Sequence, residues 1–255
     1  MHGILGLALA FTVGIVLGFL GGGGSILAVP IFLYIFRVPT NSAIAMSLPV
    51  VSMSAFVGFL THWRQGSVNL RVGIPFAICA TISAFLTGLW AHLVAEWIRL
   101  GLFAVFALTA ALFMLRDSLR ETRSDAPAIE TPPHFSVILA LTAVGVGALT
   151  SIIGAGGGFI IVPALVFFAM VPVKQAVGSS LLVITANAFA GFLGNIGRVP
   201  IDWRLVLSFT AVAALGALAG SRLHRIVPQR RIKQSFAAFV IVLWLFVIGR
   251  QLLGH

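Results

Sequence analysis

Gly18-Phe-Leu-Gly-Gly-Gly-Gly-Ser25 interrupts a long apolar run near the start of the chain, and a short apolar segment that contains Pro30 follows it. A related stretch, Ser151-Ile-Ile-Gly-Ala-Gly-Gly-Gly158, precedes a short apolar segment that contains Pro163. Each glycine weakens a helix by about 1 kcal/mol relative to alanine, so these stretches predict two helix breaks. Inside a membrane, the unpaired backbone groups of a break are tolerated only where they line a cavity in the protein. The two breaks are therefore candidates for a functional site.

The composition is that of a polytopic membrane protein. Hydrophobic residues make up 60% of the 255 residues and charged residues only 9%, against about 25% charged in a soluble domain. The formal net charge of +10 would suggest nucleic acid in a soluble protein, but here it indicates basic cytoplasmic loops, and we expect no nucleic-acid partner. The single cysteine, Cys79, excludes an intramolecular disulfide and a multi-cysteine metal site. We expect a lipid bilayer around the protein, no cofactor and no metal; no pattern indicates an oligomeric state.

Apolar segments follow one another in the same order in two halves of the chain. Those of the first half cover residues 3–20, 25–36, 41–60, 72–94 and 98–115, and those of the second cover 135–153, 159–171, 174–194, 205–221 and 234–249. Polar turns are expected at 62–69 and 195–202, and a basic cluster at 222–233 separates the last two segments. The charged stretch between the halves predicts a linker. We expect an all-α membrane protein with a first transmembrane repeat at 1–115, a cytoplasmic linker at 116–134 and a second repeat at 135–255.

A shift of 133 residues relates the two halves without a gap. It carries Gly21 onto Gly154, Gly24 onto Gly157, Pro30 onto Pro163, Pro39 onto Pro172, Ser47 onto Ser180, Gly58 onto Gly191, Asn69 onto Asp202 and Arg71 onto Arg204. Chance similarity of apolar segments would match leucines and valines but not these residues, so we infer an internal duplication.

The basic residues predict that the two repeats are inverted in the membrane. The linker and the 222–233 cluster are rich in arginine, which favours the cytoplasmic side, whereas the loop equivalent to that cluster, 92–99, is poor in basic residues. Each half has five segments, or three full crossings if the short pair is re-entrant, and either number is odd. Both termini would then lie outside. Paired repeats with broken helices at corresponding positions indicate a secondary-transporter site near the bilayer midplane, and helix N-termini at the breaks suit an anion. We therefore expect the two glycine breaks to meet there and to face one another.

Both glycine stretches, together with Pro172-Val-Lys-Gln-Ala-Val-Gly-Ser-Ser180 and its fainter copy at 39–47, resemble the TauE/SafE family of sulfite and organosulfonate exporters. The resemblance covers nearly the whole chain and implies transport of a small sulfur oxyanion across the bacterial inner membrane. The motif does not specify which anion. The first copy departs from the second at Ser25, where the second has Gly158, so the halves need not contribute equally.

The residues that we expect to bind substrate are those of the breaks and the polar residues that follow them. They are Gly22, Gly23, Gly24, Ser25, Asn41, Ser47, Gly156, Gly157, Gly158, Ser179, Ser180, Asn187, Arg71 and Arg204. The alternatives are close helix packing for the glycines and interhelical hydrogen bonds, worth about 0.6 kcal/mol each, for the serines and asparagines. For Arg71 and Arg204 the alternative is a snorkelling anchor, although a guanidinium fork also suits a sulfonate. Lys174 is a weaker anion-contact candidate, and His62 and Asn195 could line an access path or only form interfacial hydrogen bonds.

Three functions remain open. The leading hypothesis is export of a small sulfur anion by alternating access. No carboxylate lies inside an apolar run, so any ion coupling would use histidine, backbone carbonyls or the anion itself. The membrane potential alone favours anion exit by about 2.3 kcal/mol per charge per 100 mV. An importer or channel of the same fold is the second hypothesis. An intramembrane hydrolase built from Ser179 or Ser180 with His62 is the third, but it lacks both a G-x-S-x-G motif and an orienting aspartate.

Overall fold

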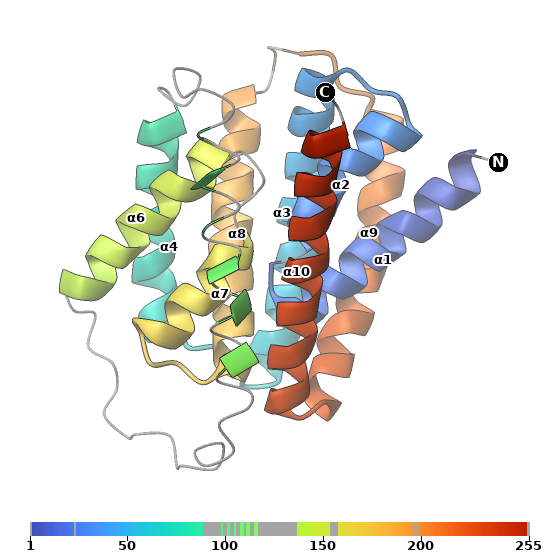
Figure 1. The fold of residues 1–255 in the computed structure, drawn as a ribbon. Helices are drawn as coiled ribbons and strands as arrows, with labels where there is room; N and C mark the ends of the chain where they lie inside the picture. The colour runs from blue at the N-terminus through green and yellow to red at the C-terminus, as the bar shows by residue number, and fades with distance from the viewer. Residues whose placement is uncertain are drawn as a thin grey trace.

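The computed structural model of the protein describes residues 2–22, 24–88, 137–153, 158–195, 197 and 199–253, with isolated positions between 98 and 116. These residues form helices and connecting turns and contain no strand (Figure 1). The helices are α1 (His2–Leu20), α2 (Gly24–Pro30), the π-helix η1 (Ile31–Ile35), α3 (Thr40–Arg64), α4 (Leu70–Gly88), α6 (Val137–Ile153), α7 (Gly158–Phe167), α8 (Val173–Asn195), α9 (Trp203–Ile226) and α10 (Gln229–Leu253). The predicted segment 98–115 and the linker 116–134 lie outside the described residues, apart from those isolated positions.

Four of the described helices are long and apolar enough to cross a membrane. They are α3, α4, α8 and α9, and α1 and α6 contain shorter apolar stretches. The prediction of an all-α membrane protein is confirmed at this level. Two details differ from the sequence prediction. The turn expected from His62 onward starts only after Arg64, and α9 runs on to Ile226 with α10 starting at Gln229, so the basic cluster occupies helix ends. Lysine and arginine are good helix formers, so polarity alone did not mark these boundaries.

α3 and α8 pack against each other and run antiparallel. The Ser52 hydroxyl donates a hydrogen bond to the Thr185 carbonyl at 3.1 Å, and these two residues are 133 positions apart. Gly58 lies against Leu181, and Gly191 lies against Leu48. The shift of 133 residues converts the contact of Gly58 with Leu181 into the contact of Gly191 with Leu48. Residue numbers rise along α3 while they fall along α8, which fixes the antiparallel direction.

The outer helices pack in two corresponding pairs, α1 with α9 and α4 with α6 (Figure 1). Gly14 of α1 lies so close to α9 that an added Cβ would sit 1.9 Å from the Ala213 carbonyl oxygen. At the equivalent place, a Cβ on Gly147 of α6 would sit 2.2 Å from the Ala80 carbonyl oxygen of α4. Small residues at such crossings let two helix backbones come into direct contact. The two pairs therefore use the same close approach.

Helix starts and ends repeat in the same way. The side chain of Asn69 accepts a hydrogen bond from the Val72 amide at 3.3 Å at the start of α4, and Asp202 accepts one from the Leu205 amide at 3.1 Å at the start of α9. Side-chain oxygens at this position satisfy amides that have no partner in the first helical turn. Beyond the short helices, Arg37 and Met170 both adopt left-handed backbone, with φ of 54° and 52°. These two residues are also 133 positions apart.

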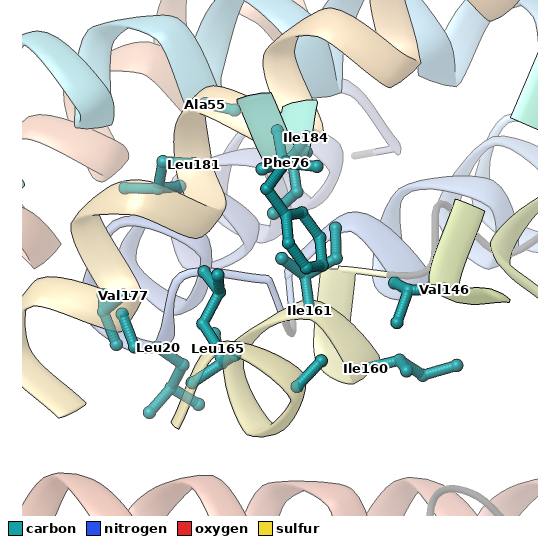
Figure 2. Close-up of a cluster of buried hydrophobic side chains, with 14 of the residues drawn as sticks. Leu20, Ala55, Phe76, Val146, Ile160, Ile161, Leu165, Val177, Leu181 and Ile184 are labelled. Atoms are coloured by element: carbon teal, nitrogen blue, oxygen red, sulfur yellow. The ribbon is translucent and has the colours of Figure 1, made fainter. Parts of the chain in front are cut away.

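An apolar core joins the two halves around the short helices. Figure 2 shows Leu20 of α1, Phe76 of α4, Ile161 of α7 and Leu181 of α8 within one buried cluster. Leu20 is 4% exposed and the other three are 0% exposed. Helices from both halves therefore enclose the region where α1 ends and α7 lies.

Candidate functional site

The first glycine break begins with a residue that has to be glycine. α1 ends at Leu20, and Gly21 turns the chain with φ of 73°, a conformation that side chains rarely adopt. The Ser180 hydroxyl of α8 donates a hydrogen bond to the Gly21 carbonyl at 2.6 Å. A Cβ on Gly21 would lie 2.7 Å from that hydroxyl oxygen and 2.9 Å from the Val177 Cα. The turn is thus held directly against α8.

The two glycine breaks meet, as the sequence predicts. A Cβ added to Gly22 would lie 2.2 Å from the Gly158 carbonyl oxygen, and one added to Gly158 would lie 2.7 Å from the Gly22 Cα. Both glycines are buried. Gly158 is the first residue of α7, so the start of one short helix lies against the break that precedes the other. Only glycine permits this backbone-to-backbone contact.

The residues that follow Gly22 fold back onto α1. A Cβ on Gly24 would lie 2.3 Å from the Val13 carbonyl oxygen. The Ser25 hydroxyl, 2% exposed, donates a hydrogen bond to the Gly22 carbonyl at 2.7 Å. Gly22, Gly24, Ser25, Gly158 and Ser180 therefore form one buried group, which we call the break contact. Of the other predicted break residues, Gly23, Gly156 and Gly157 lie outside the described residues.

The remaining polar candidates on α3 and α8 have partners away from the break contact. The Ser179 hydroxyl accepts a hydrogen bond from the Asn69 amide at 3.0 Å, and Ser47 donates to the Ile44 carbonyl of its own helix at 2.7 Å. The Thr81 hydroxyl donates to the Asn187 side-chain oxygen at 2.5 Å. That bond lies beside an apolar groove of about 340 Å³ between α4 and α8, and none of the predicted binding residues lines the groove.

The exposed candidates stand at helix starts. Asn41 is the second residue of α3, Arg71 the second of α4 and Arg204 the second of α9, and all three are exposed. Arg71 follows the carboxyl end of α3, and Arg204 follows the carboxyl end of α8. Because α3 and α8 are antiparallel, the two arginines lie at opposite ends of this pair rather than together.

Sequence reasoning missed a pair of buried histidines. His62 on α3 and His224 on α9 are both 0% exposed, with ring centroids 4.8 Å apart. The sequence places His62 in a polar turn and His224 in a basic cluster, and both settings suggest exposure. His62 also has Asn195 as its repeat equivalent, so the repeat pattern gives no signal for a histidine pair.

The hydrolase arrangement does not form among the described residues. The hydroxyls of Ser179 and Ser180 have their hydrogen bonds with Asn69, Gly21 and Val177. His62 instead bonds through Nε2 to the Gly18 carbonyl, 3.0 Å away. The nucleophile-to-base hydrogen bond that such an enzyme requires is absent from this part of the chain.

Comparison with known proteins places the chain among membrane transporters. The family described as "Sulfite exporter TauE/SafE" matches residues 6–247. A "Probable membrane transporter protein" of Xylella fastidiosa strain 9a5c is 33% identical over 246 residues, which cover 94% of this chain and 92% of that protein. "Probable membrane transporter protein MJ0441" of Methanocaldococcus jannaschii is 26% identical, with 96% of each chain covered. "Probable membrane transporter protein YdhB" of Bacillus subtilis is 23% identical, covering 88% of this chain and 91% of that one.

No solved structure matches the chain. The family match nevertheless spans both glycine breaks and all the described helices except the ends of the first and last. The relatives' names agree with it, and none of the names quoted describes an enzyme. This chain is an integral membrane protein of the TauE/SafE transporter family.

Proposed function

We propose that the protein is a secondary transporter that exports a small sulfur-containing oxyanion, such as sulfite or sulfoacetate, across the bacterial inner membrane. The break contact is its substrate site. The single observation that carries this proposal is the direct contact of Gly22 with Gly158, which brings two broken helices from the two halves of the chain together in the protein interior. The family description supplies the class of substrate.

The break contact has the groups that an oxyanion requires. The first amides of a helix lack partners within the helix and carry a partial positive charge, and α7 starts at Gly158 in the contact itself. Gly158 has no side chain to cover its own amide. The Ser25 and Ser180 hydroxyls lie on either side, and each would have to release its carbonyl partner before it could donate to an anion. A tetrahedral or pyramidal oxyanion could accept hydrogen bonds from several of the amides at once.

Two inverted repeats would provide the moving parts. The antiparallel α3 and α8 and the recurrence of their contacts after 133 residues support a two-fold relation between the halves. Two-fold-related halves around a central site can open toward either face of the membrane in turn, which is alternating access. In this arrangement Arg71 and Arg204 would stand at the two entrances and attract the anion from either side. The linker 116–134 would be cytoplasmic.

Counterflow in proteoliposomes tests the proposal. The purified full-length protein is reconstituted with unlabelled anion inside, and entry of labelled sulfite, sulfoacetate, thiosulfate and sulfate is compared. We expect accelerated exchange of at least one of sulfite and sulfoacetate. Because counterflow is independent of the physiological direction, an importer of the same anions would also give a signal. Counterflow itself separates a transporter from a channel, because a channel would show no counterflow.

Substitution of Gly22 tests the site itself. Gly22→Ala would put a Cβ against the Gly158 backbone, which cannot yield as a side chain could, so we expect exchange to fall at least tenfold. Gly145→Ala is the matched control, because Gly145 has no atom near its missing Cβ and we expect unchanged exchange. Equal exchange in the two variants would contradict the assignment of the site.

Arg204→Gln and Arg71→Gln test the proposed entrances. Each removes one exposed guanidinium from a helix start and leaves the described helix contacts in place. We expect a several-fold loss of anion affinity that shrinks at high salt, because screening weakens a long-range attraction. If neither variant loses affinity, the two arginines only anchor their helices at the membrane surface.

A further inference from the structure

The buried histidine pair lies directly beside the first glycine break. His62 Nε2 is 3.0 Å from the Gly18 carbonyl oxygen, and His224 Nδ1 is 2.8 Å from the Phe19 carbonyl oxygen. The two ring planes meet at 76°, edge against face. Both rings therefore hold the last turn of α1, which Gly21 ends. A change at either ring acts on the backbone that leads into the break contact.

The hydrogen bonds determine the tautomer of each ring. A carbonyl oxygen only accepts, so Nε2 of His62 and Nδ1 of His224 carry the hydrogen atoms. The opposite nitrogens, Nδ1 of His62 and Nε2 of His224, then hold lone pairs. Both of these nitrogens are buried and have no hydrogen-bond partner within the described part of the chain. Buried polar atoms are usually paired, so two unpaired lone pairs on neighbouring rings call for a function. Each can accept one proton.

No carboxylate of the described residues lies near the pair. Within the described residues, α1 presents no ionisable group near its end, α3 ends in Arg64, and Lys174 of α8 donates to the Arg225 carbonyl at 3.5 Å. The other ionisable residues near these helix ends are Arg222 and Arg225 on α9 and Arg230, Arg231 and Lys233 on α10. The described carboxylate, Asp202, caps the opposite end of α9. Within the described part of the chain, a proton on the pair would thus be a buried charge whose nearby ionisable groups are all basic.

These surroundings limit the pair to a single proton, and they make binding of that proton depend on a nearby negative charge. Two imidazolium rings 4.8 Å apart would repel each other, so only one ring can be charged at a time. A single buried charge is costly unless an opposite charge comes close. An anion in the break contact would be such a charge, because Gly18 and Phe19 precede Gly21 and Gly22 in the same turn.

We propose that the His62–His224 pair is a proton-binding site coupled to the anion site, and that it takes up one proton when an anion occupies the break contact. The proposal rests on the anion-transport function proposed above. Coupling is reciprocal, so protonation strengthens anion binding as much as the anion strengthens proton binding. A monovalent anion that moves with one proton carries no net charge. Its flux then follows the pH gradient and loses its dependence on membrane potential.

The pH dependence of anion affinity tests the coupling. Sulfoacetate is the probe, because its carboxyl group titrates near pH 4 and adds no proton of its own at neutral pH. Its affinity for the purified full-length protein is measured from about pH 6 to about pH 8. Uptake of one proton per anion makes affinity rise toward about tenfold for each unit decrease in pH.

Two substitutions remove the proton but keep the hydrogen bonds. In His62→Gln the amide nitrogen stands where Nε2 stood and still donates to the Gly18 carbonyl. In His224→Asn it stands where Nδ1 stood and donates to the Phe19 carbonyl. We expect the double variant, which combines both substitutions, to bind sulfoacetate with an affinity that does not vary with pH, because each single variant keeps one ring that can accept the proton. Ser221→Ala is the control, since Ser221 lies 3.5 Å from the same Gly18 carbonyl and cannot titrate; it should keep the wild-type dependence.

A second measurement observes the proton directly. The chain has six histidines, and replacement of His2, His92, His134 and His255 by Gln leaves imidazole NMR signals from the pair alone. We expect a single protonation whose midpoint moves to higher pH when sulfoacetate is added. The same midpoint with and without sulfoacetate would overturn the coupling, and so would an unchanged pH dependence in the double variant. Absence of binding by every tested anion at every pH would instead overturn the proposed function.

Discussion

At the residue scale, one hydroxyl connects α8 to the first glycine break. Ser180 donates to the Gly21 carbonyl as well as to the Val177 carbonyl of its own helix. The left-handed turn at Gly21 therefore depends on Ser180 for its position. The repeat equivalent, Ser47, donates to the Ile44 carbonyl of its own helix, and Gly154, the equivalent of Gly21, lies outside the described residues.

We predict that Ser180→Ala weakens transport more than Ser47→Ala does. The first change leaves the buried Gly21 carbonyl without this donor, at a cost of about 1–3 kcal/mol. The second removes the bond of Ser47 within its own helix, which is its hydrogen bond among the described residues. Counterflow rates and thermal unfolding of both variants in detergent check the prediction, with the wild type as reference. An equal loss of exchange in the two variants would mean that the Gly21 bond has no special part in the site.

The sequence carries much, but not all, of the information at this scale. The glycine breaks and the pairing of Ser47 with Ser180 follow from the 133-residue shift, and the meeting of the breaks is confirmed by Gly22 and Gly158. The shift could not show that Ser180 bonds to the Gly21 carbonyl, because a relation between two halves of a sequence does not say which residues come into contact. The histidine pair was missed for a related reason. His224 comes near His62 only through the packing of α9 against α3, which no local pattern records.

At the scale of the element, close helix packing decides which glycines are needed. Gly147 and Gly145 are two residues apart on α6, and only Gly147 faces α4. A Cβ on Gly147 would overlap the Ala80 carbonyl, which belongs to a helix backbone and cannot move aside cheaply. A Cβ on Gly145 would meet open space.

We predict opposite effects of alanine at these two positions. Gly147→Ala should lower the unfolding temperature by separating α6 from α4, whereas Gly145→Ala should leave it unchanged or raise it, since alanine favours helix by about 1 kcal/mol. Thermal unfolding in one detergent at one protein concentration makes the comparison. A lower unfolding temperature for Gly145→Ala than for Gly147→Ala would refute the α4–α6 packing described here.

Helix boundaries show what the sequence predicts well and what it does not at this scale. The short segments after the breaks were predicted, because glycine runs and prolines mark them directly. The start of α9 is similarly marked, and Asp202 caps it. The ends of α3 and α9 were placed too early, at polar residues that in fact continue the helix. Polarity shows where a helix leaves an apolar environment, but the helix ends only where the backbone can find other partners.

The cap gives a further prediction. The Asp202 side chain accepts hydrogen bonds from the Arg204 and Leu205 amides, so Asp202→Ala should cost about 1 kcal/mol of stability by exposing two unpaired amides. Asp202→Asn keeps an acceptor oxygen and should retain most of the wild-type stability. Thermal unfolding distinguishes the two variants. Equal losses in both would attribute the effect to the carboxylate charge rather than to the cap.

At the scale of the whole molecule, one relation accounts for several separate observations. Contacts between α3 and α8, the close approaches of α1 with α9 and α4 with α6, and the two left-handed residues after the short helices all recur after 133 residues. A duplicated sequence explains equal elements, but it does not by itself make corresponding elements pack in corresponding pairs. Packing of that kind is what two halves related by a two-fold axis produce. Ser52 and Thr185 are repeat equivalents that contact each other, so the axis would pass near them.

The orientation of this axis predicts where Arg71 and Arg204 lie relative to the membrane. If the axis lies in the membrane plane, the two residues face opposite sides, because each follows the carboxyl end of one of the antiparallel helices α3 and α8.

Cys79→Ala provides a cysteine-free background, to which Arg71→Cys or Arg204→Cys is added. A membrane-impermeant maleimide should then label one variant only in right-side-out vesicles and the other only in inverted vesicles. The parent Cys79→Ala chain should stay unlabelled in both, and each variant should retain counterflow as evidence of its fold. Labelling of both positions from the same side would contradict the antiparallel crossing of α3 and α8. Alternating access between inverted repeats could not then be the mechanism.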